Sequence, residues 1–449
     1  MPPFAFAIFI SAALLFLVQP LTGKLLLPLL GGSPSVWNTC MVFFQAVLLL
    51  GYLYSHLITK HLKPAAQAIV HVAVLSLAAI SLPISAELAP AAPESPTRWL
   101  LQTLALTVGL PFFVVATTGP LIQRWFSRTQ HAAAKDPYFL YAASNLGSVI
   151  GLLAYPIVLE PLLTREGQST VWTLGYALLG IALVVCAALT LKASRAATRS
   201  YETAALPEAP KTVPLTWKRR ALWVFYAFIP SSLMLGVTQH ISTDIAAIPL
   251  LWIVPLLIYL ASFIIAFSPR FPTLAAALGR GLPFAMLALL LVLVSGLLTH
   301  VLITVSIHLL VFALVATLAH RRLADDRPGV EHLTEFYLLM SVGGVLGGIF
   351  NALLAPIVFP TVLEYPIVLG LACTITPQFA AALPGAFASP KRCLRSLAFL
   401  ALVAVACLAA LLLAEKSFTA NWAKSLASAS ATPNPLLPGL LRAALTVPI

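Results

Sequence analysis

Apolar blocks of about 20 residues recur along the whole chain, and each is long enough to cross a hydrocarbon core about 30 Å thick as an α-helix. The blocks lack the alternation of apolar and polar residues that marks barrel strands. Backbone groups in lipid must also find their hydrogen-bond partners inside the protein. Because 60% of the residues are hydrophobic and only 9% are charged, the sequence predicts an all-α polytopic membrane protein.

The blocks predict twelve main helices and a less regular tail. We expect helices near residues 4–29, 36–58, 66–84, 99–123, 138–162, 170–191, 220–238, 245–267, 281–298, 301–319, 333–358 and 362–382. A thirteenth is expected at 396–414, and 435–449 is expected to be a short interfacial or fourteenth helix. The first block has no basic region before it and no small-residue cleavage site, so we interpret it as a membrane span and not as a signal peptide.

The basic residues predict the orientation of the chain. With the N-terminus in the cytoplasm, 20 of the 26 Lys and Arg residues fall in cytoplasmic segments, which is the usual bias of membrane proteins. We therefore expect a multi-pass membrane protein with a cytoplasmic N-terminus, surrounded by lipid. The net charge of +12 does not indicate nucleic-acid binding, because the basic residues are spread over short loops without interleaved aromatic residues.

A polar segment and an internal repeat divide the chain. Residues 193–219 are rich in Pro, Ala, Thr and charges, which is typical of a linker, between a six-helix half at 1–192 and another at 220–390. The remaining 391–449 would hold the extra helix and tail. SNLGSVIGLLAYPIV (144–158) matches GVLGGIFNALLAPIV (344–358) at an offset of 200 residues. Two parallel six-helix copies are typical of transporters of the major facilitator type.

Polar side chains at membrane depth are the candidate site residues, because burying them in lipid is costly and usually serves a function. We select eight such residues: Asp244, His240, Gln239, Gln19, Lys24, Asn145, Glu160 and Asn351. Lys24 either lines a cavity or extends its stem to the membrane interface. Glu160 is either a site residue or an interfacial carboxylate. Asn145 and Asn351 are equally explained by hydrogen bonds between helices.

The stretch TQHISTD (238–244) interrupts two long apolar segments. We expect it to form the polar turn between the seventh and eighth helices, with Ser242, Thr243 or Asp244 capping the eighth. A cap requires only one residue, so the remaining polar groups leave room for a binding site. If the helix instead continues, His240 and Asp244 share one face.

These residues suggest a division of roles. Asp244 would be the countercharge for a solute, His240 a proton-responsive partner, and Gln19 and Gln239 neutral hydrogen-bonding groups. Lys24 argues against a purely cationic solute.

No motif in the chain predicts catalysis, a metal or a cofactor. There is no nucleotide-binding loop, no serine-hydrolase elbow and no zinc-binding HExxH. The five cysteines are scattered without metal-ligand spacing, so we expect them to act as small apolar core residues. A protein that is not an enzyme by itself is therefore expected, and a His–Asp pair alone is weak support for catalysis.

Four blocks together resemble the membrane portion of the bacterial fused MFS/spermidine-synthase-like proteins. They are FLVQPLTGKLLLPLLGGSPSVWNTCMVFFQAVLLLGYLYSH, DPYFLYAASNLGS, SSLMLGVTQHISTDIAAIPLLW and HLTEFYLLMSVGGVLGGIFNALLAP. In that family a Rossmann-type domain resembling aminopropyltransferases follows the membrane region. The present sequence contains no such domain, so no aminopropyl-transfer role is expected for its residues. The signature usual in the loop after the second helix is also replaced, by LITKHLKPAA.

Two functions remain open from the sequence. The first is a transporter-like protein that moves or senses a small polar or cationic solute, and the resemblance adds a polyamine theme to it. The second is a non-transporting membrane scaffold that docks a separately encoded synthase-like domain on its cytoplasmic face.

Overall fold

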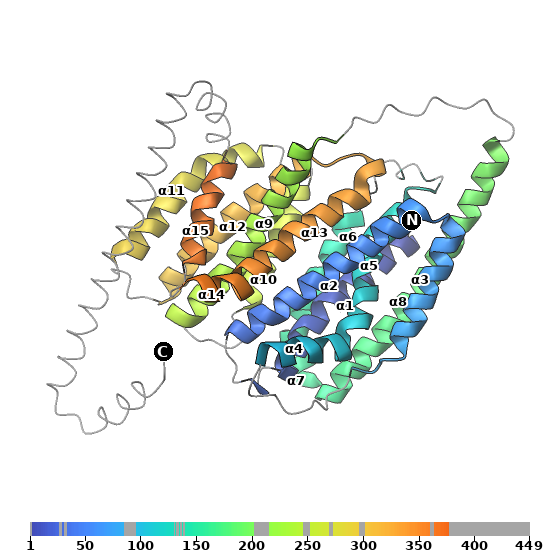
Figure 1. Ribbon diagram of the computed structural model, residues 1–449, viewed down its shortest axis with the longest axis horizontal. Coiled ribbons are helices and arrows are strands. Elements are labelled where there is room, and N and C mark those ends of the chain that lie inside the picture. The colour runs from blue at the N-terminus through green and yellow to red at the C-terminus, as the bar shows by residue number, and fades with distance from the viewer. Residues whose placement is uncertain are drawn as a thin grey trace. The chain divides into compact units, whose positions relative to one another are not determined.

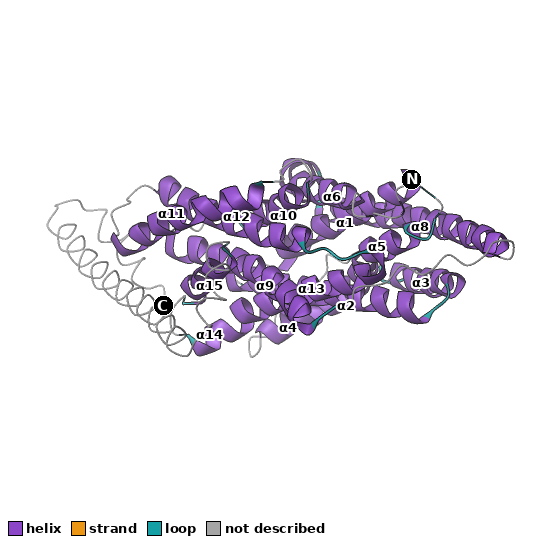
Figure 2. Ribbon diagram, turned by 90° about the horizontal axis from the view of Figure 1, so that it is seen from above, coloured by secondary structure: helices purple, strands orange, loops and turns teal. Residues whose placement is uncertain are grey.

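The structure is a computed structural model that describes residues 2–26, 29–30, 34–84, 96–129, 131, 134, 137, 140–201, 215–245, 252–268, 273–295, 301–359 and 363–376. Within these residues the regular secondary structure is helical throughout (Figures 1 and 2). The α-helices are α1 (Pro2–Leu26), α2 (Pro34–His61), α3 (Pro64–Ala79), α4 (Pro96–Leu104), α5 (Leu110–Phe126), α6 (Leu140–Ala154), α7 (Glu160–Leu162), α8 (Arg165–Tyr201), α9 (Trp217–His240), α10 (Ile253–Phe267), α11 (Leu274–Ser295), α12 (Val301–Asp325), α13 (Leu333–Ile349), α14 (Ala355–Val358) and α15 (Glu364–Ala372). Four π-helical segments continue or join them: η2 (Ala105–Gly109), η5 (Tyr155–Leu159), η6 (Ile241–Ile245) and η8 (Phe350–Leu354).

The helices account for all twelve main predicted spans. Among the described residues, eight helical stretches are long and apolar enough to cross a membrane. Four shorter apolar helices lie at the remaining predicted positions: Pro64–Ala79, Ile253–Phe267, Ala277–Leu290 and Glu364–Ile375. The all-α polytopic prediction is confirmed. The predicted helices at 396–414 and 435–449 lie outside the described residues.

The chain divides into two compact units. The first contains residues 1–280 and 312–377, and the second contains 281–311 and 378–449. In the second unit the described residues are the C-terminal part of α11 and the N-terminal part of α12. The first unit holds every contact discussed below.

Two predicted boundaries differ from the structure. The turn expected at 238–244 is wrong, because α9 continues directly into η6 and α10 begins only after Trp252. The Thr243 hydroxyl donates to the Gln239 carbonyl oxygen four residues back (2.7 Å), so it satisfies its own helix instead of capping the next one. At the expected linker, α8 extends past residue 192 to Tyr201.

Two pairs of helices, α1 with α6 and α9 with α13, pack against each other extensively. Glycine residues allow their backbones to approach closely. A Cβ atom on Gly147 would lie 2.2 Å from the carbonyl oxygen of Phe9 in α1. A Cβ atom on Gly343 would lie equally close, 2.2 Å, to the carbonyl oxygen of Val224 in α9. Only a residue without a side chain allows backbones to approach this closely. At the offset of 200 residues the counterpart of Gly147 is Gly347, whose Cβ would lie 2.8 Å from the backbone nitrogen of Ser232 in α9. Both repeated segments therefore contain a glycine that packs closely against the backbone of another helix.

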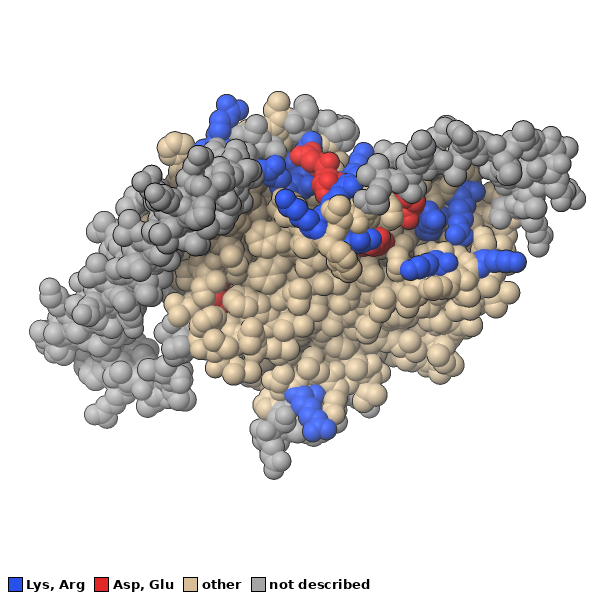
Figure 3. Space-filling view, turned by 45° about the horizontal axis from the view of Figure 1, so that its top comes forward, with Lys and Arg blue, Asp and Glu red and all other residues tan. Residues whose placement is uncertain are grey.

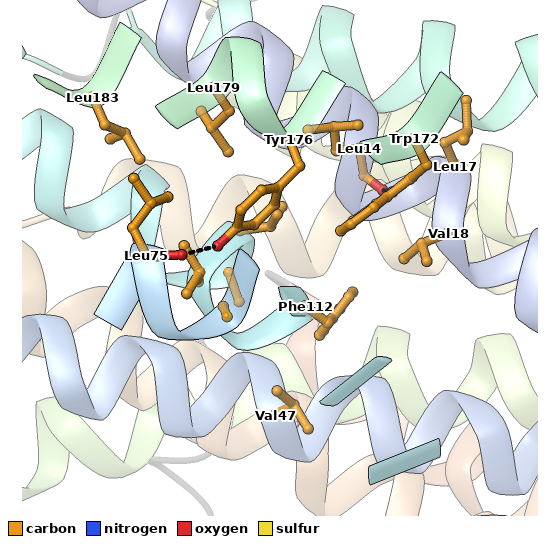
Figure 4. Close-up of a cluster of buried hydrophobic side chains, with 14 of the residues drawn as sticks. Leu14, Leu17, Val18, Val47, Leu75, Phe112, Trp172, Tyr176, Leu179 and Leu183 are labelled. Atoms are coloured by element: carbon orange, nitrogen blue, oxygen red, sulfur yellow. Dashed lines mark hydrogen bonds between the residues drawn. The ribbon is translucent and has the colours of Figure 1, made fainter. Parts of the chain in front are cut away.

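A buried cluster of apolar side chains packs α8 against α1 and α3 (Figure 4). Trp172 and Tyr176 project from α8 into this cluster, and both rings are almost fully buried. The Trp172 indole nitrogen donates to the Leu14 carbonyl oxygen (2.9 Å), and the Tyr176 hydroxyl donates to the Leu75 carbonyl oxygen (2.9 Å). These bonds satisfy the polar tips of large aromatic side chains away from water.

The cysteines only partly follow the prediction. Cys40 and Cys186 are buried, as expected of small core residues. Cys373 is exposed, which contradicts the prediction for that residue, and Cys393 and Cys407 lie outside the described residues.

Candidate functional site

A cavity of about 180 Å³ lies between helices of the two predicted halves. Helices α1, α2, α5 and α6 line it from the first half, and α9, α10 and α13 line it from the second. At roughly 10–15 Å³ for each water molecule, the space suits about a dozen waters or one small solute. None of the described residues that line it is Asp, Glu, Lys, Arg or His.

Amide and hydroxyl groups supply the polarity of the cavity. Gln19 of α1, Gln45 of α2 and Asn145 of α6 contribute amides, and Ser341 of α13 contributes a hydroxyl. Three of their buried atoms have no hydrogen-bond partner in the structure: Gln19 Oε1, Gln45 Oε1 and Ser341 Oγ. Buried polar groups without partners are rare and costly, so these three atoms mark where a solute or ordered water would bind.

Helix α2 presents one continuous face toward the second half. Asn38, Gln45 and Tyr52 are spaced seven residues apart, which is two helical turns, and His56 follows one turn later. Gln45 and Tyr52 line the cavity, whereas Asn38 and His56 contact the second half on either side of it. At 1.5 Å of rise per residue, these two outer contacts lie about 27 Å apart along the helix.

At one end of α2, uncharged side chains join the halves. The Trp37 and Trp252 rings are stacked, with centroids 4.6 Å apart and planes 10° from parallel. Asn38 Nδ2 donates to Gln239 Oε1 (3.1 Å). We call this set the tryptophan gate.

At the other end, three polar contacts join the halves. The Tyr337 hydroxyl donates to Gln123 Oε1 (2.8 Å), and His56 Nδ1 lies 3.0 Å from Thr334 Oγ1. The Arg124 guanidinium donates to the Val330 carbonyl oxygen (2.8 Å). We call this set the arginine gate. The cavity is therefore bounded on both sides by contacts between the halves.

Charged residues are concentrated away from the middle of the molecule. On the face drawn in Figure 3, most of the visible Lys and Arg side chains gather along the upper edge, and a broad area with few charged side chains lies below them. Close to the arginine gate, Arg220 Nε pairs with Glu335 Oε1 (2.6 Å). An area with few charges beside a basic rim is what a lipid-embedded protein presents.

The predicted site residues separate into two groups. Gln19 and Asn145 line the cavity. Gln239 belongs to the tryptophan gate, and the His240 ring stacks on Tyr365, with centroids 5.4 Å apart.

Three other predicted residues, Asn351, Lys24 and Glu160, lie outside the cavity lining. Asn351 makes the interhelical bond that the sequence suggested, from Nδ2 to Ser232 Oγ (2.6 Å). Lys24 pairs with Glu160. The Asp244 backbone belongs to η6, and its side chain lies outside the described residues. Which of the eight residues bind a solute stays a prediction.

The Lys24–Glu160 ion pair joins α1 to α7. The Lys24 side chain is 41% exposed and that of Glu160 is 26% exposed, so solvent screens the pair and limits its contribution to about 1 kcal/mol or less. We expect a double-mutant cycle with Lys24→Met and Glu160→Gln, followed by thermal unfolding in detergent, to give a coupling free energy within that limit. A coupling free energy of several kcal/mol would show that solvent does not screen the charges of this pair.

Four residues of the candidate site were not predicted from the sequence: Asn38, Gln45, Tyr52 and Ser341. A signal for the first three was present, because polar or aromatic residues at a seven-residue spacing mark one face of an apolar helix. Ser341 gave no such signal, since a single serine in an apolar helix usually bonds to its own backbone.

Solved transporter structures resemble the chain in fold. A crystal structure of a peptide transporter of the POT family in complex with sulfate matches with a TM-score of 0.52 at 14% identity, and the match covers 85% of this chain and 94% of that one. The proton:xylose symporter XylE of the major facilitator superfamily, bound to 6-bromo-6-deoxy-D-glucose, matches with a TM-score of 0.50 at 11% identity, over 83% of this chain and 94% of that one. The chain therefore shares the fold of these two structures. No protein-family model and no curated protein matches the sequence.

Proposed function

We propose that this chain carries a small polar solute across a membrane by alternating access. The observation that carries the proposal is the cavity between the two predicted halves, with the tryptophan gate on one side and the arginine gate on the other. Opening one gate while the other stays closed would expose the cavity to one side of the membrane at a time. The transporter-type fold supports the same function.

The proposal includes an orientation. Basic residues at the arginine gate favour a cytoplasmic location for that end, in keeping with the excess of Lys and Arg in cytoplasmic segments. The N-terminus would then also be cytoplasmic, in a bacterial inner membrane. The polyamine theme and the separately encoded synthase-like partner come from the family resemblance, and both stay predictions.

Cross-linking each gate tests the mechanism. In a background whose five native cysteines are replaced, the paired variants are Asn38→Cys with Gln239→Cys and His56→Cys with Thr334→Cys. A short bifunctional thiol reagent is expected to lower flux about tenfold or more in either pair, because alternating access requires both gates to open.

Flux would be measured by mass spectrometry on proteoliposomes that are offered a defined solute panel: myo-inositol, xylitol, nicotinamide, putrescine, spermidine and malate. The four single-cysteine variants, treated with the same reagent, are the matched controls and should keep their flux. Unchanged flux in both cross-linked pairs would rule out alternating access between these halves.

A further inference from the structure

We propose that the cavity binds an uncharged solute rich in hydrogen-bond donors, of the polyol or primary-amide class. This assignment rests on the proposed transport function and narrows it to one class of solute. This assignment is an alternative to the polyamine theme of the family resemblance, and the two predict different solutes.

The lack of charge in the cavity lining is the first line of support. An ammonium or carboxylate moved from water into a cavity without a partner of opposite charge loses several kcal/mol of hydration. Among the described residues, no member of the lining offers such a partner. The predicted site residues Lys24 and Glu160 are charged, but they pair with each other and neither of them lines the cavity. A neutral solute avoids this cost.

The orientation of Gln45 is the second line of support. The Ser231 hydroxyl donates its proton to the Gly344 carbonyl oxygen (2.9 Å), so its oxygen must act as acceptor toward Gln45 Nε2 (3.1 Å). The amide nitrogen of Gln45 is thereby engaged, and its Oε1 is left as an acceptor without a partner. This oxygen lies against Gly348 of α13 and has almost no accessible surface. A solute that donates an O–H or N–H bond would satisfy it once the Gln45 side chain turns toward the cavity.

Gln19 and Ser341 complete the polar side of the cavity. The Gln19 residue is only 3% exposed and Ser341 only 8% exposed, and Gln19 Oε1 and Ser341 Oγ lack partners. Gln19 and Gln45 belong to the first half, and Ser341 belongs to the second. A solute with several donors would therefore bond to both halves at once.

Aromatic side chains form the apolar side of the cavity. The Tyr141 and Tyr337 rings lie parallel, at 1° with centroids 5.7 Å apart, and both line the cavity together with Phe112. Such walls suit the carbon face of a polyol or the plane of an amide, because binding sites combine apolar walls with a few placed polar groups.

The solute panel tests the assignment directly. Wild-type protein in proteoliposomes is expected to accumulate myo-inositol, xylitol or nicotinamide, and to accumulate none of putrescine, spermidine and malate. Gln19→Glu should lower the uptake of the neutral solute about tenfold or more, because it places an unpaired carboxylate beside the solute. Gln102→Glu, on the exposed face of α4, is the matched control and should leave uptake unchanged.

The outcomes separate this assignment from the transport proposal. Accumulation of a charged panel member by wild-type protein would overturn the assignment and leave transport intact. Full uptake of the neutral solute by Gln19→Glu would also overturn it. If no panel member accumulates, the result counts against transport itself and therefore against the assignment that depends on it.

Discussion

Gly344→Trp is expected to abolish solute flux while the protein remains folded. Gly344 lines the cavity, and no atom lies within 4 Å of the place where its Cβ would be. An indole can therefore enter without displacing the backbone, and it would occupy much of a cavity of about 180 Å³. We expect uptake of the solute panel to fall to the level of empty proteoliposomes, with an unchanged elution profile in size-exclusion chromatography.

Gly370→Trp is the matched control for this variant. Gly370 in α15 also has nothing within 4 Å of its Cβ position, but it is exposed and does not line the cavity. Its flux should match that of the wild type. Normal flux in a folded Gly344→Trp protein would show that the solute does not pass through this cavity.

Gly343→Ala, one residue earlier, is expected to destabilise the fold. The new Cβ would lie 2.2 Å from the Val224 carbonyl oxygen and 2.8 Å from the Ala227 Cβ atom, so α9 and α13 would have to separate. Overpacking of this kind costs about 1–3 kcal/mol and sometimes more. The measurement is the midpoint of thermal unfolding in detergent, which should fall by several degrees.

Gly344→Ala is the corresponding control, since it adds the same methyl group to the neighbouring residue at a place with room for it. Its unfolding midpoint should stay at the wild-type value. Equal stability of the two alanine variants would mean that α9 and α13 are not held together by close backbone contact at Gly343.

The fold could largely be predicted because lipid imposes a simple rule on sequence. Each apolar block has to become a helix, and this predicted all twelve main spans. The boundaries at polar stretches were harder, because a short polar side chain can bond to its own helix or cap the next one. Thr243 does the former, and the expected turn at 238–244 became helix instead. Likewise, the stretch after residue 192 has charges typical of a linker but also alanines that favour helix.

The candidate site could be predicted only in part. Gln19 and Asn145 were identified as unusual amides in apolar helices, and both line the cavity. The sequence could not show that Lys24 and Glu160, 136 residues apart, form a pair, because that depends on how α1 packs near α7. For the same reason it could not show which half contacts the polar face of α2.

The two gates differ in the forces that close them, and this difference has a consequence for control. The tryptophan gate contains a ring stack and a bond between neutral amides, which salt does not screen and protons do not alter. The arginine gate includes a guanidinium and an imidazole, and charged contacts weaken as ionic strength rises. Under the proposed mechanism, changes in salt or acidity would therefore act more directly on the contacts of the arginine gate than on those of the tryptophan gate, and would shift the balance between inward-open and outward-open populations.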